Sequence, residues 1–87
     1  MQIYGIERVR RKMTDEKLLR AKIDENGLKL RFVAAKCGLS YQGFLNKITN
    51  QSEFTVPEIQ ALRALLNLSR DEVDEIFFAE RVDKVST

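Results

Sequence analysis

Few residues of this sequence could carry out catalytic or metal-binding chemistry. The 87-residue chain contains no histidine, and Cys37 is its single cysteine. Nucleophilic Cys–His and Ser–His pairs, histidine acid–base catalysis and zinc sites built from histidines or four cysteines are therefore excluded. The acidic residues are spread over helix starts and helix faces instead of forming a convergent pair, and no phosphate-binding glycine loop occurs. We expect no enzymatic activity, no cofactor and no metal.

The charged residues are unevenly distributed along the chain. Residues 1–50 carry eleven Lys or Arg and five Asp or Glu, whereas residues 51–87 carry four basic and eight acidic residues. A basic half joined to an acidic half predicts one surface that binds a polyanion and another with a different role. No apolar run approaches the ~18 residues needed to span a bilayer, and the N-terminus lacks the order of a secretory signal. We expect a cytoplasmic protein that does not insert into membranes.

The elements that position these charges are short amphipathic helices. Capping residues, apolar spacing and glycines predict helices over about 15–26, 30–37 and 41–49, with Thr14 as the first N-cap. Capping-box spacings at Thr55 and Ser69 begin a fourth and a fifth helix. Cys37 lies on an apolar helical stripe, which is typical of a small buried hydrophobe. No strand-like alternation competes, so the sequence predicts an all-α fold of five short helices in one domain.

The connection between the second and third helices is unusually tight. Ala34 is small where two helix backbones approach, Gly38 supplies a left-handed turn, Leu39 fills the corner and Ser40 can cap the next helix. A connection this short leaves no room for an antiparallel hairpin, so the two helices must pack at a steep angle. This pattern predicts a helix-turn-helix at about residues 30–49.

The segments "KLRFVAAKCGLSYQGFLNKI" and "EIQALRALLNLSRDEV" carry a family resemblance. Over roughly residues 18–77 the chain resembles the lambda-type (Cro/cI, or Xre-like) helix-turn-helix regulators, and small phage Cro-like proteins match it best in size and layout. The resemblance implies a five-helix, lambda-repressor-like domain that binds double-stranded operator DNA with its third helix in the major groove. It further implies a sequence-specific transcriptional regulator, a repressor of phage or mobile-element type.

The resemblance also nominates site residues. Positions that reach base edges in relatives correspond here to Tyr41, Gln42, Gly43 and Asn46, and Gln and Asn side chains can bond an adenine edge bidentately. The alternative is that these residues form ordinary solvated surface. Positions that hold phosphate in relatives correspond to Lys29, Arg31, Ser40, Lys47, Asn50 and Gln51.

Two residues depart from the family pattern. Lys47 stands where relatives commonly have an apolar residue, which here comes one position later, at Ile48. Gly43 lies inside the predicted recognition helix, where it costs about 1 kcal/mol relative to alanine. Close approach to DNA and simple tolerance both remain open as reasons for Gly43.

The two ends of the chain invite separate predictions. Residues 1–13 form a basic N-terminal extension, which is either a disordered tail or a DNA-tracking arm. The helix-turn-helix domain then occupies residues 14–87 with a C-terminal helix or tail. If helical spacing continues past the fifth helix, Phe78, Val82 and Val85 form a second apolar stripe. This stripe predicts a homodimer interface, the alternative being that Phe78 folds onto the core and the last residues fray.

A second class of function is a protein-interaction module, such as an antitoxin-like or antirepressor-binding partner. In that case the acidic C-terminal half would be the working surface. Salt dependence separates the two, because phosphate neutralisation makes DNA affinity fall steeply with salt, whereas an apolar protein interface responds little.

Overall fold

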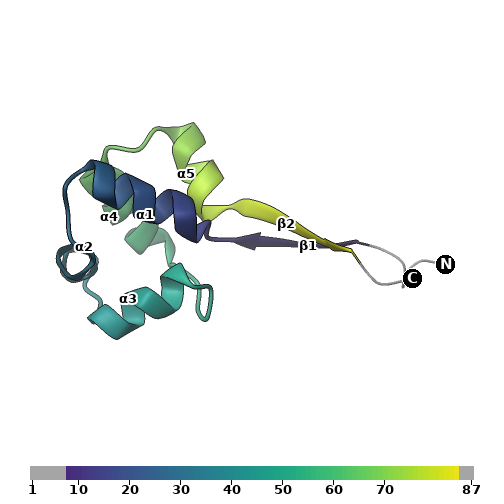
Figure 1. The fold of residues 1–87 in the computed structure, drawn as a ribbon, viewed down its shortest axis with the longest axis horizontal. Coiled ribbons are helices and arrows are strands. Elements are labelled where there is room, and N and C mark those ends of the chain that lie inside the picture. The colour runs from purple at the N-terminus through teal and green to yellow at the C-terminus, as the bar shows by residue number, and fades with distance from the viewer. Residues whose placement is uncertain (1–7, 85–87) are drawn as a thin grey trace.

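The structure is a helical body from which a two-stranded sheet projects (Figure 1). The computed structural model describes the backbone of residues 8–84 and the side chains of residues 13–79. None of the helices in this part of the chain has the length and hydropathy that crossing a bilayer requires. The elements in chain order are β1 (Arg8–Met13), α1 (Glu16–Glu25), α2 (Leu30–Lys36), α3 (Tyr41–Ile48), α4 (Val56–Leu66), α5 (Arg70–Phe77) and β2 (Ala79–Lys84).

The five predicted helices are confirmed, and local capping explains most of their ends. Thr55 and Ser69 form complete capping boxes with Glu58 and Glu72 at the starts of α4 and α5. The predicted cap of α1 is wrong by one residue, because the side chain of Asp15, not that of Thr14, accepts from the backbone N–H of Leu18.

The connection between α2 and α3 has the expected left-handed glycine. Gly38 adopts φ +75° and directly follows Cys37, the C-cap of α2. In Figure 1, α2 is seen almost along its axis while α3 runs across the view, so the two helices cross steeply. Ala34 is buried in α2, as expected for a small residue in a helix that packs closely on its neighbour.

The all-α prediction needs a correction at the two ends of the helical body. β1 and β2 pair antiparallel, in a register that runs from Met13 opposite Ala79 to Arg8 opposite Lys84. Residues 8–13 of the N-terminal extension are therefore a strand, not a disordered tail, while residues 1–7 lie outside the described part of the chain. Neither strand alternates clearly between apolar and polar residues, so local sequence does not reveal the pairing.

The predicted apolar stripe at the C-terminus is also wrong, because it assumes that helical spacing continues past the fifth helix. Helix α5 ends at Phe77, Phe78 is its C-cap, and Val82 belongs to strand β2. A spacing of four residues therefore no longer places Phe78 and Val82 on one helix face, and Val85 lies outside the described residues. Phe78 is 42% exposed. It lines a shallow pocket of about 100 Å³ at the root of the sheet, together with Met13, Phe54 and Phe77.

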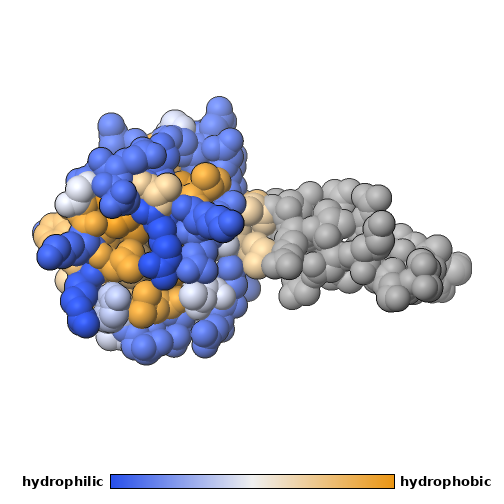
Figure 2. Space-filling view, in the orientation of Figure 1, coloured by the Kyte–Doolittle hydropathy of each residue, from blue (hydrophilic) through white to orange (hydrophobic). Residues whose placement is uncertain are grey.

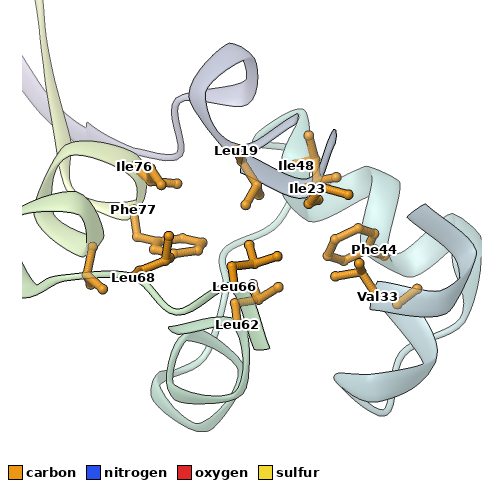
Figure 3. Packing of buried hydrophobic residues seen from close by; sticks show 12 residues of the cluster. Leu19, Ile23, Val33, Phe44, Ile48, Leu62, Leu66, Leu68, Ile76 and Phe77 are labelled. Carbon is orange, nitrogen blue, oxygen red and sulfur yellow. The ribbon is translucent and has the colours of Figure 1, made fainter. Parts of the chain in front are cut away.

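One hydrophobic core unites the five helices (Figure 3). Leu62 and Leu66 of α4 lie near its centre, with Phe44 and Val33 to one side and α5 residues to the other. Phe54 extends the core by edge-to-face contacts with the rings of Phe44 and Phe77, at centroid distances of 5.9 and 5.4 Å. The core therefore holds α3 from its inner side, and the outer side of α3 is left available.

Candidate nucleic-acid interface

Helix α3 is anchored by two large side chains and a cap. Phe44 and Ile48, four residues apart, are completely buried. The Ser40 hydroxyl accepts from the backbone N–H of Gly43 at 3.0 Å, which closes the N-terminus of the helix. Phe44 and Ile48 fix the rotation of α3 about its axis, and Ser40 fixes its start. The polar residues on the other side of the helix therefore have defined positions.

The residues predicted to contact bases lie together on α3. Gln42 is exposed, and its Nε2 donates to Oδ1 of Asn46 at 2.9 Å. Two amides held side by side on one helix face present several donors and acceptors at once, which suits recognition of base edges. Neither amide belongs to the hydrophobic core, so exchanging this hydrogen bond for bonds to a ligand would cost the fold little.

Tyr41 is covered by a cation that sequence reasoning did not connect to it. The guanidinium carbon of Arg31 in α2 lies 4.2 Å from the centroid of the Tyr41 ring, a cation–π contact across the turn. Arg31 is exposed, and its guanidinium lies beside the N-terminus of α3. A basic residue ahead of the turn and an aromatic residue just after the Ser40 cap are the sequence signal that could have suggested this pair.

Gly43 has a local structural explanation. A Cβ added to this residue would lie 3.0 Å from the Ser40 hydroxyl oxygen, closer than side chains usually approach. Glycine therefore relieves crowding at the N-cap of α3. Neither close approach to a ligand nor simple tolerance is needed to account for it.

The predicted phosphate-binding residues fall into two groups. Lys29, Arg31, Ser40 and Gln51 are exposed near the ends of α2 and α3. Lys29 is the N-cap of α2 and makes no side-chain capping bond. These four are candidates because they are exposed, although Ser40 also caps α3 and Arg31 also stacks on Tyr41. Lys47 and Asn50 hold other parts of the fold together.

Lys47 forms an ion pair with Glu58, whereas the sequence predicts that it contacts a phosphate. Its Nζ lies 2.6 Å from Oε1 of Glu58, and the two side chains are only 15% and 14% exposed. Burial by itself would raise the pKa of Glu58, but the hydrogen bonds from Lys47 and from the backbone N–H of Thr55 outweigh it and hold the pKa below its ordinary value. Lys47 thus joins α3 to the capping box of α4, and this pairing competes with its expected phosphate contact, which stays a prediction.

Asn50 is likewise committed to the fold. It adopts φ +67°, and its side chain makes two hydrogen bonds with the backbone of Thr14. Oδ1 accepts from the Thr14 N–H and Nδ2 donates to the Thr14 carbonyl, both at 2.9 Å. Both ends of the amide thus fasten the chain after α3 to the segment between β1 and α1. This structural role competes with the expected phosphate contact of Asn50, which stays a prediction.

Cys37 is half-buried beside this region. Burial is the main reason that the pKa of its thiol is raised to about 11. Since the thiolate is the nucleophilic form, the thiol is a poor nucleophile at neutral pH. This agrees with its expected role as a small apolar residue.

The surface around α3 combines two sets of polar groups. The adjacent amides of Gln42 and Asn46 belong to α3, whose other side packs in the core, while Lys29 and the stacked guanidinium of Arg31 lie at the start of α2. Figure 2 shows that hydrophilic residues dominate the rim of the helical body, that the most hydrophobic residues gather in the middle of the face in view, and that only weakly hydrophobic residues lie where the body meets the sheet. No protein-family model, curated protein or solved structure matches the chain.

Proposed function

We propose that the protein is a sequence-specific DNA-binding regulator of transcription that reads the major groove with α3. The observation that carries this proposal is the hydrogen-bonded amide pair of Gln42 and Asn46 on a helix that Phe44 and Ile48 anchor from behind. The major groove admits an α-helix, and amide side chains recognise adenine there. The resemblance to lambda-type helix-turn-helix regulators adds the role of a phage or mobile-element repressor.

Selection of bound duplexes from a random DNA pool tests this function directly. Enrichment of one sequence motif supports a specific regulator. Recovery of no duplex above background, or of duplexes without a common motif, contradicts it.

We expect Gln42→Ala and Asn46→Ala to relax base preference in the selected duplex. Each removes a base-edge contact worth roughly 1–3 kcal/mol. Because the two amides bond to each other, the double variant should lose less than the sum of the single losses. Titration against all single-base variants of the duplex measures both effects, and unchanged preferences in both single variants would rule out α3 as the reading element.

Arg31 and Lys47 should behave differently although both are basic. Arg31→Gln is expected to weaken binding to all sequences alike and to lower the salt slope by about one, because an exposed phosphate contact is lost. Lys47→Met should leave the slope unchanged, since its ammonium pairs with Glu58. Affinities measured over a range of salt concentrations distinguish them. A lower slope for Lys47→Met would instead support the phosphate contact expected of Lys47.

A two-fold dimer remains part of this proposal. A single recognition helix reads few base pairs, and dimers that read half-sites one helical turn apart solve this problem for helix-turn-helix proteins. The interface cannot be the helical stripe expected from sequence. Sedimentation of the free protein and of its complex with the selected duplex gives the number of copies, and one copy in both states would exclude the dimer.

The alternative function, a protein-interaction module, is favoured by one observation. Helix α5 exposes Asp71, Asp74 and Glu75, while Glu72 pairs with Lys22 of α1. An acidic helix could bind a basic protein partner. The salt titration described above, made with DNA, discriminates because only DNA binding predicts a steep slope with duplex as the ligand.

A further inference from the structure

The projecting sheet has one face that is richer in positive charge than the other. Residues directly opposite each other in an antiparallel pair share a face, and successive residues alternate between faces. The register therefore places on one face, here called the cationic face, Arg8, Arg10, Lys12, Lys84, Val82 and Glu80. The other face holds Val9, Arg11, Met13, Asp83, Arg81 and Ala79. Four basic residues and one acidic residue occupy the cationic face, against two and one on the other.

This charge pattern is unfavourable for an isolated two-stranded sheet. Arg8 lies directly opposite Lys84, and Arg11 opposite Arg81. Like charges in opposite positions destabilise strand pairing, and a two-stranded sheet without further cover is of marginal stability. A bound polyanion would remove the repulsion on the cationic face. Charged residues along both edges also discourage pairing with the edge of a second copy, which makes a polyanion the better occupant.

The root of the sheet is fastened to the end of α3. Thr14, the residue after β1, makes two hydrogen bonds with Asn50, which follows α3. The next residue, Asp15, donates its backbone N–H to the carbonyl of Ile76 in α5. In Figure 1 the C-terminal end of α3 points toward this root, and the sheet continues away from the helical body beyond it. A ligand that extends along α3 would therefore pass the root of the sheet.

The length of the sheet also suits a duplex. Each strand has six residues, or about 20 Å at ~3.4 Å per residue. Residues on one face recur about every 6.8 Å along a strand, and phosphates recur about every 3.4 Å along the axis of each DNA strand.

We propose that the cationic face binds the phosphate backbone of the same DNA duplex whose major groove α3 reads. This inference rests on the function proposed above and adds a second, sequence-independent contact outside the helical body. The sheet would add affinity and orientation, while base selection stays with α3.

The test compares two triple variants of the full chain that change net charge equally. Arg8→Gln/Arg10→Gln/Lys12→Gln neutralises one strand of the cationic face. Lys17→Gln/Arg63→Gln/Arg70→Gln neutralises exposed residues on α1, α4 and α5. The probe is a fluorescein-labelled mixed-sequence duplex of about three helical turns, titrated by anisotropy between about 50 and 200 mM KCl. We expect the first variant to lower the salt slope by about 2.7, at 0.9 per phosphate contact, and the second to leave it close to wild type.

A loss of DNA affinity could also be caused by misfolding. Two single variants avoid this ambiguity, because we expect one to raise the affinity and the other to leave it unchanged. Glu80→Gln removes the acidic residue of the cationic face and should tighten binding severalfold. Asp83→Asn makes the same charge change on the other face and should have little effect. Equal effects of these two variants, or equal slopes for the two triple variants, would overturn the proposal.

The same experiment separates this inference from the function on which it rests. Wild-type protein that shows no salt-dependent binding to the duplex overturns both. Wild-type protein that binds, with base preference lost in Gln42→Ala and Asn46→Ala but equal slopes in the two triple variants, overturns the sheet contact alone. Sedimentation gives one more outcome. If wild type is a dimer and the first triple variant is a monomer with an unchanged salt slope per protomer, the sheet is an interface between copies. That result would likewise overturn DNA binding by this face.

Discussion

Asn50→Ala is expected to lower the free energy of unfolding by about 2–4 kcal/mol. The substitution leaves the N–H and C=O of Thr14 without their partners, and Thr14 is buried. It also places alanine at φ +67°, where only glycine and asparagine are readily accommodated. For a domain of this size each kcal/mol lowers the melting temperature by roughly 4–8 °C. Thermal and urea unfolding followed by circular dichroism measure the loss.

A graded series and a matched control identify its cause. Asn50→Asp keeps the acceptor for the Thr14 N–H but loses the donor, so its cost should be intermediate. Asn50→Gly removes the backbone strain but restores neither hydrogen bond to Thr14, so this variant should remain clearly destabilised. Asn67 is the control, because it also adopts a left-handed conformation, with φ +55°, at the C-cap of α4 and is exposed. Asn67→Gly should be nearly neutral. If Asn50→Gly is also neutral, backbone conformation and not the Thr14 bonds explains the role of Asn50.

Lys47→Met is expected to destabilise the fold by about 1–3 kcal/mol. It leaves the Glu58 carboxylate largely buried without its cation, although Glu58 keeps its capping bond from Thr55. Adding Glu58→Gln to this variant removes the unpaired charge and retains a capping acceptor. The double variant should therefore be more stable than Lys47→Met alone, and a double-mutant cycle of unfolding free energies gives the coupling.

The pH dependence of this pair has a defined sign. The folded-state pKa of Glu58 lies below its ordinary value, so its contribution is fully present above the unfolded-state pKa of about 4.3. The contribution is lost as the pH falls through the lower, folded-state pKa. The difference in stability between wild type and Lys47→Met should accordingly shrink in acid. A difference that stays constant from about pH 7 to pH 3 would mean that Lys47 acts through packing of its methylene groups instead of its charge.

Part of the candidate site was accessible from sequence. Tyr41, Gln42 and Asn46 are expected on the outer side of the third helix, and all three belong to α3, whose buried residues are Phe44 and Ile48. The adjacency of Gln42 and Asn46 follows from their spacing of four residues. The roles of Lys47 and Asn50 did not follow, because their partners are Glu58 in the next helix and Thr14 far upstream in the chain.

The sequence by itself determined the five helices and the turn between α2 and α3. Their signals are local: side-chain oxygens at Ser40, Thr55 and Ser69 satisfy N–H groups three residues later, and Gly38 relieves a left-handed backbone. A local interaction needs no knowledge of the rest of the chain, so each of these could be identified from a few neighbouring residues.

Only the tertiary structure decided that the two ends of the described chain pair as strands. Packing of α1 against α5 brings residues 13 and 79 together, and the hydrogen bonds from Asp15 to Ile76 and between Thr14 and Asn50 hold the start of the sheet there. The strands then pair through backbone groups that every residue possesses, so neither strand carries a distinctive sequence pattern. Their pairing is a consequence of the helical body, because closing so long a loop is favourable only once that body has formed.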